Sequence, residues 1–344
     1  MKIWKFIIGI FFIFALNIPF MVLAQDTGTK TCANKAFNLL KQKDKIGYDI
    51  VNKVNDMNFF TTWLFCENPP LYNLTAAVHE TNHQLSFKLS DYTNGFYGYY
   101  LGNEQTLTVK MKNLFYRSKI SEYLDAFDKG QNYYELYLTG DSGNQDITVL
   151  LDEVNAYTHS LNSSICFVDL ISKYTMQSDR DGLATFMYYF ELYLKKARIS
   201  YPDQWKQMYN DPEYLDLFAA LWKRAESVLK TGLKYSQLGI QDKFIIKKVY
   251  DKKNIDELVQ VFAKGGQTFT YDTNILKTAN NLKQTLIPSG NNPVNTNQKT
   301  ITTQTTTKTI TINGQPMTME QFKEYLKEHP ELKSLPQIQE LLKP

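Results

Sequence analysis

Apolar residues recur at helical spacing along most of the chain between residues 33 and 264. Side chains three or four positions apart share one face of a helix, so this pattern predicts helices that bury one side. The predicted helical segments are 33–64, 71–89, 118–139, 146–162, 164–175, 180–198, 212–230, 240–250 and 254–264. Tyr, Phe and Trp are frequent in the later segments, which favours a core of bulky rings.

One segment departs from the helical period. In residues 94–112 a run of aromatic residues precedes Gly102-Asn103-Glu104-Gln105, and apolar residues then alternate with polar ones. Two such runs around a short turn predict a β-hairpin. The expected fold class is therefore mainly α, within the α+β group, with a small hairpin, a helical C-terminal half and a flexible tail.

The N-terminal 24 residues have the pattern of a signal peptide. Lys2 and Lys5 precede an apolar run from residue 7 to 16, and Val22-Leu23-Ala24 forms a small-residue cleavage site. We therefore expect residues 1–24 to be removed and the protein to be secreted or periplasmic. No later segment is long and apolar enough to predict a stable membrane span.

The rest of the chain divides by composition. Residues 25–285 predict one main domain, with 25–163 and 164–285 as its two parts. Residues 286–313 are rich in Thr, Asn and Gln and predict a linker, because polar low-complexity sequence buries little core. Residues 314–344 predict a small helical tail unit able to dock on a partner.

Charge and cysteine content narrow the possible functions. The formal charge of +3 becomes +1 without Lys2 and Lys5, and no basic run remains, so no nucleic-acid partner is expected. Cys32, Cys66 and Cys166 suggest one disulfide and one free thiol in an exported protein. A Cys32–Cys66 bridge would fasten the N-terminal helical segment.

The candidate chemistry is concentrated in His79-Glu80-Thr81-Asn82-His83. If this stretch is helical, His79 and His83 lie one turn apart and present both imidazoles to one metal ion. Glu80 is then placed to accept a proton from the water that the metal activates. Two of the four histidines of the chain are in this motif.

The flanking residues make this motif similar to that of the zincin metallopeptidases. The residues beside the histidines are uncharged, and Leu85 supplies the hydrophobe two positions after His83, whereas Ala76 departs mildly from the pattern. The resemblance implies a bound Zn²⁺ and hydrolysis of peptide bonds. The metzincin branch needs a Gly and a third His soon afterwards, which residues 84–89 do not supply. The gluzincin branch takes a Glu from a downstream helix.

Glu153 is the expected third ligand. It borders the apolar stripe of the segment 146–162, and Glu153-x-x-Ala156 resembles the second-helix motif of several gluzincins. Glu191, in a strongly apolar and aromatic helix, is the alternative ligand. Asp152 is a candidate for holding a histidine ligand in place, although the pattern favours a solvated residue at this position.

An electrophilic group that stabilises the oxyanion is also expected. Tyr157, one helical turn after Glu153, is the candidate, with His159 as the alternative. The sequence thus predicts an exported zinc metallopeptidase of the gluzincin type acting on a peptide or protein substrate. The alternative is a non-catalytic exported binding or adhesion protein with a structural or vestigial metal site.

Overall fold

The computed structural model describes residues 27–64, 73–171 and 177–282, together with three short strands within residues 301–318. The chain forms two compact units, residues 1–294 and 295–344. The predicted signal peptide, residues 1–24, lies outside the described residues. Among the described residues, no helix combines the length and the hydropathy that a membrane span needs.

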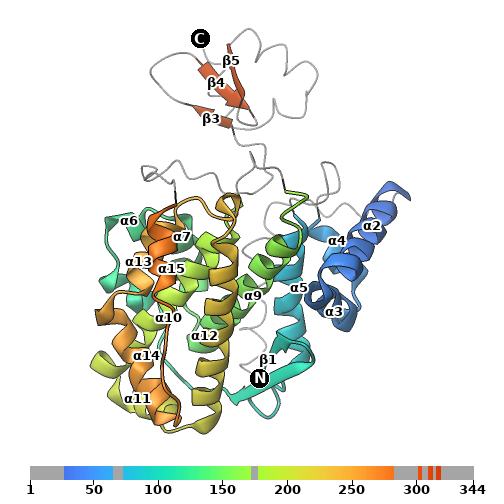
Figure 1. Ribbon diagram of the computed structural model, residues 1–344. Coiled ribbons are helices and arrows are strands. Elements are labelled where there is room, and N and C mark those ends of the chain that lie inside the picture. The colour runs from blue at the N-terminus through green and yellow to red at the C-terminus, as the bar shows by residue number, and fades with distance from the viewer. Residues whose placement is uncertain are drawn as a thin grey trace. The chain divides into compact units, whose positions relative to one another are not determined.

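The larger unit is mainly helical, with one small sheet (Figure 1). Its first part contains α2 (Thr27–Lys43), α3 (Lys45–Val54), α4 (Met57–Thr62), α5 (Leu74–Leu89), β1 (Phe96–Gly102) and β2 (Gln105–Lys110). Short helices follow: η1 (Arg117–Tyr123), α6 (Ala126–Lys129), α7 (Asn132–Leu138) and α8 (Gly140–Gly143). The remainder contains α9 (Ile147–Cys166), α10 (Asp179–Ser200), α11 (Pro202–Tyr209), α12 (Pro212–Gly232), η2 (Ser236–Leu238), α13 (Asp242–Val249), α14 (Lys252–Lys264) and α15 (Asn274–Asn280).

Aspartates begin several of these helices. The carboxylate of Asp44 accepts a hydrogen bond from the backbone N–H of Gly47 at the start of α3, and Asp56 does the same at α4. Asp146 caps α9 by accepting from the N–H of Thr148. Each contact satisfies an N–H that has no partner inside the helix, which fixes where the helix starts.

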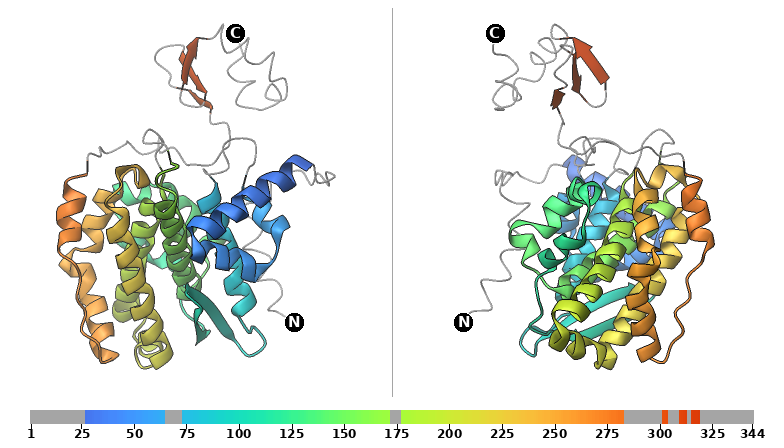
Figure 2. Two further views of the ribbon diagram at one scale, coloured as in Figure 1. Left: turned by 45° about the vertical axis from the view of Figure 1, so that its right-hand side comes forward. Right: turned by 90° about the vertical axis from the view of Figure 1, so that its left-hand side faces the viewer.

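The long helix α9 is the centre of the larger unit. It packs between α5 on one side and α10 and α12 on the other (Figures 1 and 2). Two glycines allow the close approach: a Cβ at Gly182 would stand 2.1 Å from the ring of Tyr157, and one at Gly232 would stand 3.2 Å from Leu161. Fifteen of the twenty residues of α9 are buried, polar ones included, and the other five are half-buried.

Two hydrophobic clusters meet beside α9. The larger cluster takes the apolar residues of α9 and of most later helices, while the smaller one takes those of α2 to α5. The helix α5 therefore buries Leu74, Ala77, Val78 and Leu85 away from α9. The polar residues of α5 and α9 face each other along the seam between the clusters.

The predicted hairpin is confirmed: β1 and β2 pair in an antiparallel register with Tyr97 opposite Val109. The mainly helical architecture is confirmed as well. The single helix predicted over 118–139 is wrong, because η1, α6 and α7 replace it with breaks between them. The helix predicted over 164–175 is also wrong in part, since α9 ends at Cys166 and turns follow.

The second unit contains a three-stranded antiparallel sheet of β3 (Ile301–Thr303), β4 (Thr309–Ile312) and β5 (Gln315–Thr318). The sequence-based prediction of a linker and a helical tail did not include these strands. Alternating Thr and Ile residues favour strands, because β-branched side chains fit a pleated surface. The helical tail predicted after residue 318 lies outside the described residues.

The cysteines agree with the expected count of one free thiol. Cys166 is free, at the end of α9. Cys32 is disulfide-bonded. Cys66 lies outside the described residues, so the Cys32–Cys66 pairing stays a prediction.

Candidate metal centre

The helices α5 and α9 bring three metal-ligating side chains together. The Nε2 atoms of His79 and His83 are 3.0 Å apart, and each lies 3.5 Å from Oε2 of Glu153. Tetrahedral ligands at about 2.0–2.1 Å from zinc stand roughly 3.3 Å from one another. The three donor atoms of this group therefore have the separations of three corners of such a tetrahedron.

Burial makes this group unusual. His79 and Glu153 are almost fully buried and His83 is half-buried. Within residues 27–64, 73–171 and 177–282, it is the one set of three His, Cys, Asp or Glu side chains whose donor atoms converge in this way. The group could hold a metal ion, and buried charged groups are stable only with such a partner or with an ion pair.

The electrostatics of the group favour a cation. Burial by itself lowers the pKa of His83, but the carboxylates of Asp152 and Glu153 outweigh it and raise that pKa well above its usual range. Burial raises the pKa of Glu153, yet both histidines more than offset this and the net pKa is lowered. A positive charge is thus stabilised at this point, and a metal ion would take the place of the proton on His83.

Asp152 holds His83 from behind. Its Oδ2 lies 2.6 Å from Nδ1 of His83 and accepts a hydrogen bond from Tyr97 OH at 3.0 Å. Its Oδ1 accepts a hydrogen bond from Ser86 Oγ at 2.6 Å. A carboxylate on Nδ1 leaves Nε2 of the ring free to bind a metal and fixes the ring's orientation. Asp152 is buried, so the favoured interpretation of it as a solvated residue is wrong, and its contacts agree with the alternative that it supports a histidine ligand.

We expect Asp152→Asn to weaken metal binding by about 10- to 100-fold, as loss of such a supporting carboxylate does in metal sites. The amide of Asn carries no charge. It can present either its oxygen or its NH2 group to Nδ1 of His83, so it does not enforce the tautomer in which Nε2 is free to bind a metal. Competition with a chromophoric chelator measures the affinity. Asp216→Asn, at an exposed position of α12, is the matched control and should leave the affinity unchanged.

Glu80 lies next to His79 on α5 and lines the same hollow as the three candidate ligands. Its pKa is raised, chiefly by burial and in addition by Glu153 and Asp152, while the two histidines act in the opposite direction. A carboxylate with a raised pKa is a better proton acceptor than an ordinary one. Glu80 could therefore accept a proton at the wall of this hollow.

The hollow beside the group has a volume of about 130 Å³. Its remaining wall comes from seven elements and the segments next to them, and is mostly aromatic or aliphatic. The wall residues are Phe59, Trp63, Gln84, Phe87, Tyr97, Arg117, Leu136, Tyr137, Ser142, Gln145 and Val149. A ligand that reaches the three candidate metal-ligating side chains therefore contacts a largely apolar surface.

No protein-family model matches this chain, and neither a curated protein nor a solved structure shows significant similarity to it. The interpretation of the centre therefore rests on its geometry and chemistry.

The alternative third ligand, Glu191, lies elsewhere. It is fully buried on α10, and the hollow beside the two histidines does not include it. Neither of its carboxylate oxygens has a hydrogen-bond partner in the described part of the chain. Burial, together with Asp251, raises the pKa of Glu191 well above its usual range.

Tyr157 contacts the centre without lining the hollow. Its ring meets the ring of His79 edge-on at 4.4 Å, and its hydroxyl lies 3.2 Å from that of Tyr137, which does line the hollow. Its role at the oxyanion stays a prediction. The alternative, His159, belongs to a separate network with the carbonyl of Tyr100 and the guanidinium of Arg224.

The sequence analysis missed Ser86, Tyr97, Arg117 and Tyr137. Ser86 carried a usable signal, because it lies three positions after His83 and so shares its helix face. The other three come from β1, η1 and α7, and no local pattern connects those segments to α5 or α9. Only the tertiary structure brings them to the hollow.

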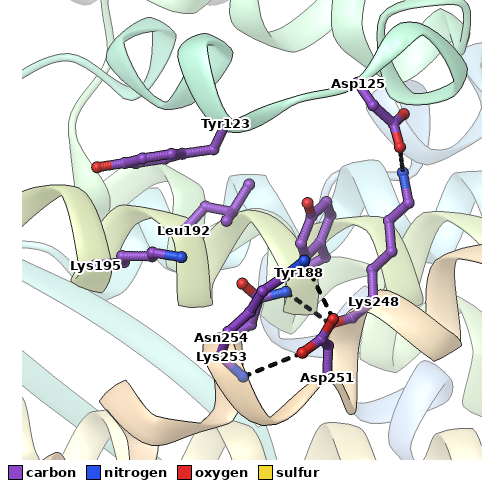
Figure 3. A pocket seen from close by; sticks show the side chains of 9 residues that line it. All are labelled: Tyr123, Asp125, Tyr188, Leu192, Lys195, Lys248, Asp251, Lys253 and Asn254. Carbon is purple, nitrogen blue, oxygen red and sulfur yellow. Dashed lines mark hydrogen bonds and ion pairs between the residues drawn. The ribbon is translucent and has the colours of Figure 1, made fainter.

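A second hollow, of about 320 Å³, lies between η1, α10, α13 and α14 (Figure 3). Its charged walls are largely neutralised internally: Lys248 pairs with Asp125 at 2.7 Å, and Lys253 with Asp251 at 3.2 Å. Lys195 lies over the ring of Tyr123. Among the described residues that line it, no three metal-ligating donors converge as they do at the centre on α5 and α9.

Proposed function

We propose that the protein is an exported, zinc-dependent hydrolase of peptide bonds. The observation that supports this most is the combination of three converging donor atoms, a carboxylate behind His83, and Glu80 on the wall of the same hollow. Two histidines and one glutamate are a ligand set typical of catalytic zinc. The zincin resemblance of the segment around His79 points the same way.

A zinc ion held by His79, His83 and Glu153 would polarise a carbonyl group and lower the pKa of a nearby water molecule. Glu80 accepts the proton of the attacking water and then donates it to the leaving amine. Asp152 keeps His83 oriented throughout. Each of these roles uses a side chain whose position is described above.

The wall of the hollow indicates the kind of substrate. Phe59, Trp63 and Phe87 present rings to it, and Leu136 and Val149 add aliphatic surface. Burial of apolar area stabilises binding by about 25 cal/mol per Å². We therefore expect peptides with a bulky apolar side chain next to the cleaved bond to be preferred over those with a charged one.

The rival proposal is a non-catalytic binding protein with a structural metal. Structural zinc sites usually have four protein ligands and no open position. Three donors beside a hollow, with a proton acceptor on its wall, support catalysis instead.

The direct test is metal analysis of the purified mature protein followed by peptide hydrolysis. We expect about one zinc per chain, loss of cleavage on chelation, and recovery when zinc is added back. N-terminal sequencing of the exported protein should begin at Gln25. Stoichiometric zinc without any cleavage of a broad peptide mixture would favour the binding protein.

A further inference from the structure

Arg117 is a buried cation on the wall of the candidate metal centre. It begins η1, is 1% exposed, and lines the same hollow as His79, His83 and Glu153. Its Nε donates hydrogen bonds to the carbonyl oxygens of Tyr137 at 2.8 Å and Ser142 at 3.0 Å. Its Nη2 donates to Oγ of Ser142. These contacts hold the guanidinium in one orientation.

The third nitrogen, Nη1, is left without a partner. It is shut off from water and makes no hydrogen bond within the part of the chain that the structure describes. No carboxylate in that part lies within ion-pair distance of Arg117. The ring of Tyr137, 5.4 Å from Cζ, offers only a weak substitute for an anion.

A second buried arginine, Arg180, has a hydrogen-bond partner for each of its guanidinium nitrogens. Arg180 is fully buried and pairs with Asp242, which is also fully buried. Its Nη1 donates to the carbonyl oxygens of Gly232 and Tyr235, so every nitrogen has a partner. The open side of Arg117 is therefore not a general property of buried arginines in this fold.

An unpaired buried charge is costly, and proteins retain one mainly where a ligand completes it. Among the described residues that line the hollow, Arg117 is the only charged one apart from the candidate ligands, Glu80 and Asp152. A guanidinium suits carboxylates and other oxygen anions through its planar fork of N–H groups. The missing partner is thus expected to be an oxygen anion that enters the hollow.

We propose that Arg117 binds a negatively charged oxygen of the substrate beside the metal centre. Two substrate oxygens have this chemistry: the carbonyl oxygen as it becomes an oxyanion, and a C-terminal carboxylate. Because Nη1 is shielded from water, the substrate must part the side chains of the wall to reach it. The proposal rests on the proposed function for its substrate, a peptide.

The experiment uses one peptide sequence in two forms, with a free C-terminal carboxylate and with a C-terminal amide. Arg117→Lys keeps the charge but loses the fork, and Arg117→Gln loses both. If Arg117 stabilises the oxyanion, kcat falls about 10²- to 10³-fold on both peptides with little change in KM. If it binds the terminal carboxylate, kcat/KM falls about 10- to 100-fold on the free acid alone.

Arg180→Lys is the matched control. It disturbs an equally buried guanidinium that does not line the hollow, so it should lower the melting temperature without changing the ratio of kcat/KM for the two peptides. Equal kinetics of wild-type protein and both Arg117 variants would overturn the proposal. The proposal would also be overturned if the activity of the Arg117 variants fell only in proportion to a lower melting temperature, as is expected for Arg180→Lys.

Binding to the full-length wild-type protein tests Arg117 without any variant and without turnover. After chelation, a phosphinic peptide, whose tetrahedral anion mimics the oxyanion, or the free-acid peptide should bind at least about tenfold more tightly than the neutral amide. Equal binding of all three would overturn the assignment of Arg117. Absence of hydrolysis by the zinc-loaded protein, with the binding preference intact, would overturn the proposed function and leave this assignment standing.

Discussion

Replacing Glu80 with Gln is expected to lower kcat for peptide hydrolysis by about 10²- to 10⁴-fold while zinc content and melting temperature stay close to those of the wild type. The amide has nearly the same shape as the carboxylate but cannot accept the proton of the attacking water. Glu80 is not among the three converging donors, so its loss should leave metal binding intact. Steady-state kinetics on a fluorogenic peptide, with metal analysis of the same preparation, measure both.

The matched control for this experiment is Glu135→Gln. Glu135 is an exposed residue of α7, the helix that also supplies Leu136 and Tyr137 to the hollow. It should retain wild-type kcat and KM. Wild-type turnover by Glu80→Gln would show that Glu80 does not transfer the proton, and another acceptor would then be required.

The second large effect is expected when the buried Glu153 is replaced. Glu153→Gln should abolish stoichiometric zinc binding, because a neutral amide is a poor zinc ligand and two histidines remain. Glu191→Gln, the matched control, should bind zinc normally. Burial raises the pKa of its carboxyl group well above the usual range and so favours the neutral form, which an amide resembles, so the substitution should change stability little.

Isothermal titration with zinc, or competition with a chelator, measures both variants. In the wild type and in Glu191→Gln, zinc should also raise the melting temperature, because an ion that binds only the folded state stabilises it. Zinc loss in Glu191→Gln together with retention in Glu153→Gln would contradict the ligand assignment and favour the alternative ligand.

Local sequence was sufficient where the physics is local. The spacing of His79 and His83 places two imidazoles on one helix face, whatever surrounds that helix. The change from helical to alternating periodicity marked the hairpin, and β1 and β2 pair there. Glu153 was predicted from its position at the edge of an apolar stripe, which is again a property of one helix.

Local sequence failed to predict where one helix ends and the next begins, because these boundaries depend on packing. The segment 118–139 has helical spacing, yet it folds as η1, α6 and α7. The buried guanidinium of Arg117 donates hydrogen bonds to the carbonyl oxygens of Tyr137 and Ser142. Asp125 and Asp128 form the N-terminal cap of α6 within the segment. These contacts hold short turns in place of one continuous helix.

The sequence by itself determined the helical metal motif, the mainly helical class and the identity of the groups able to ligate a metal. The tertiary structure decided which of Glu153 and Glu191 meets the histidines, because 70 residues separate His83 from Glu153 and only the packing of α5 on α9 brings them together. It also decided that Asp152 faces Nδ1 of His83 and that Arg117 is buried with one side open. Contacts between distant segments depend on how helices pack, and a periodic pattern in one segment does not specify its partner.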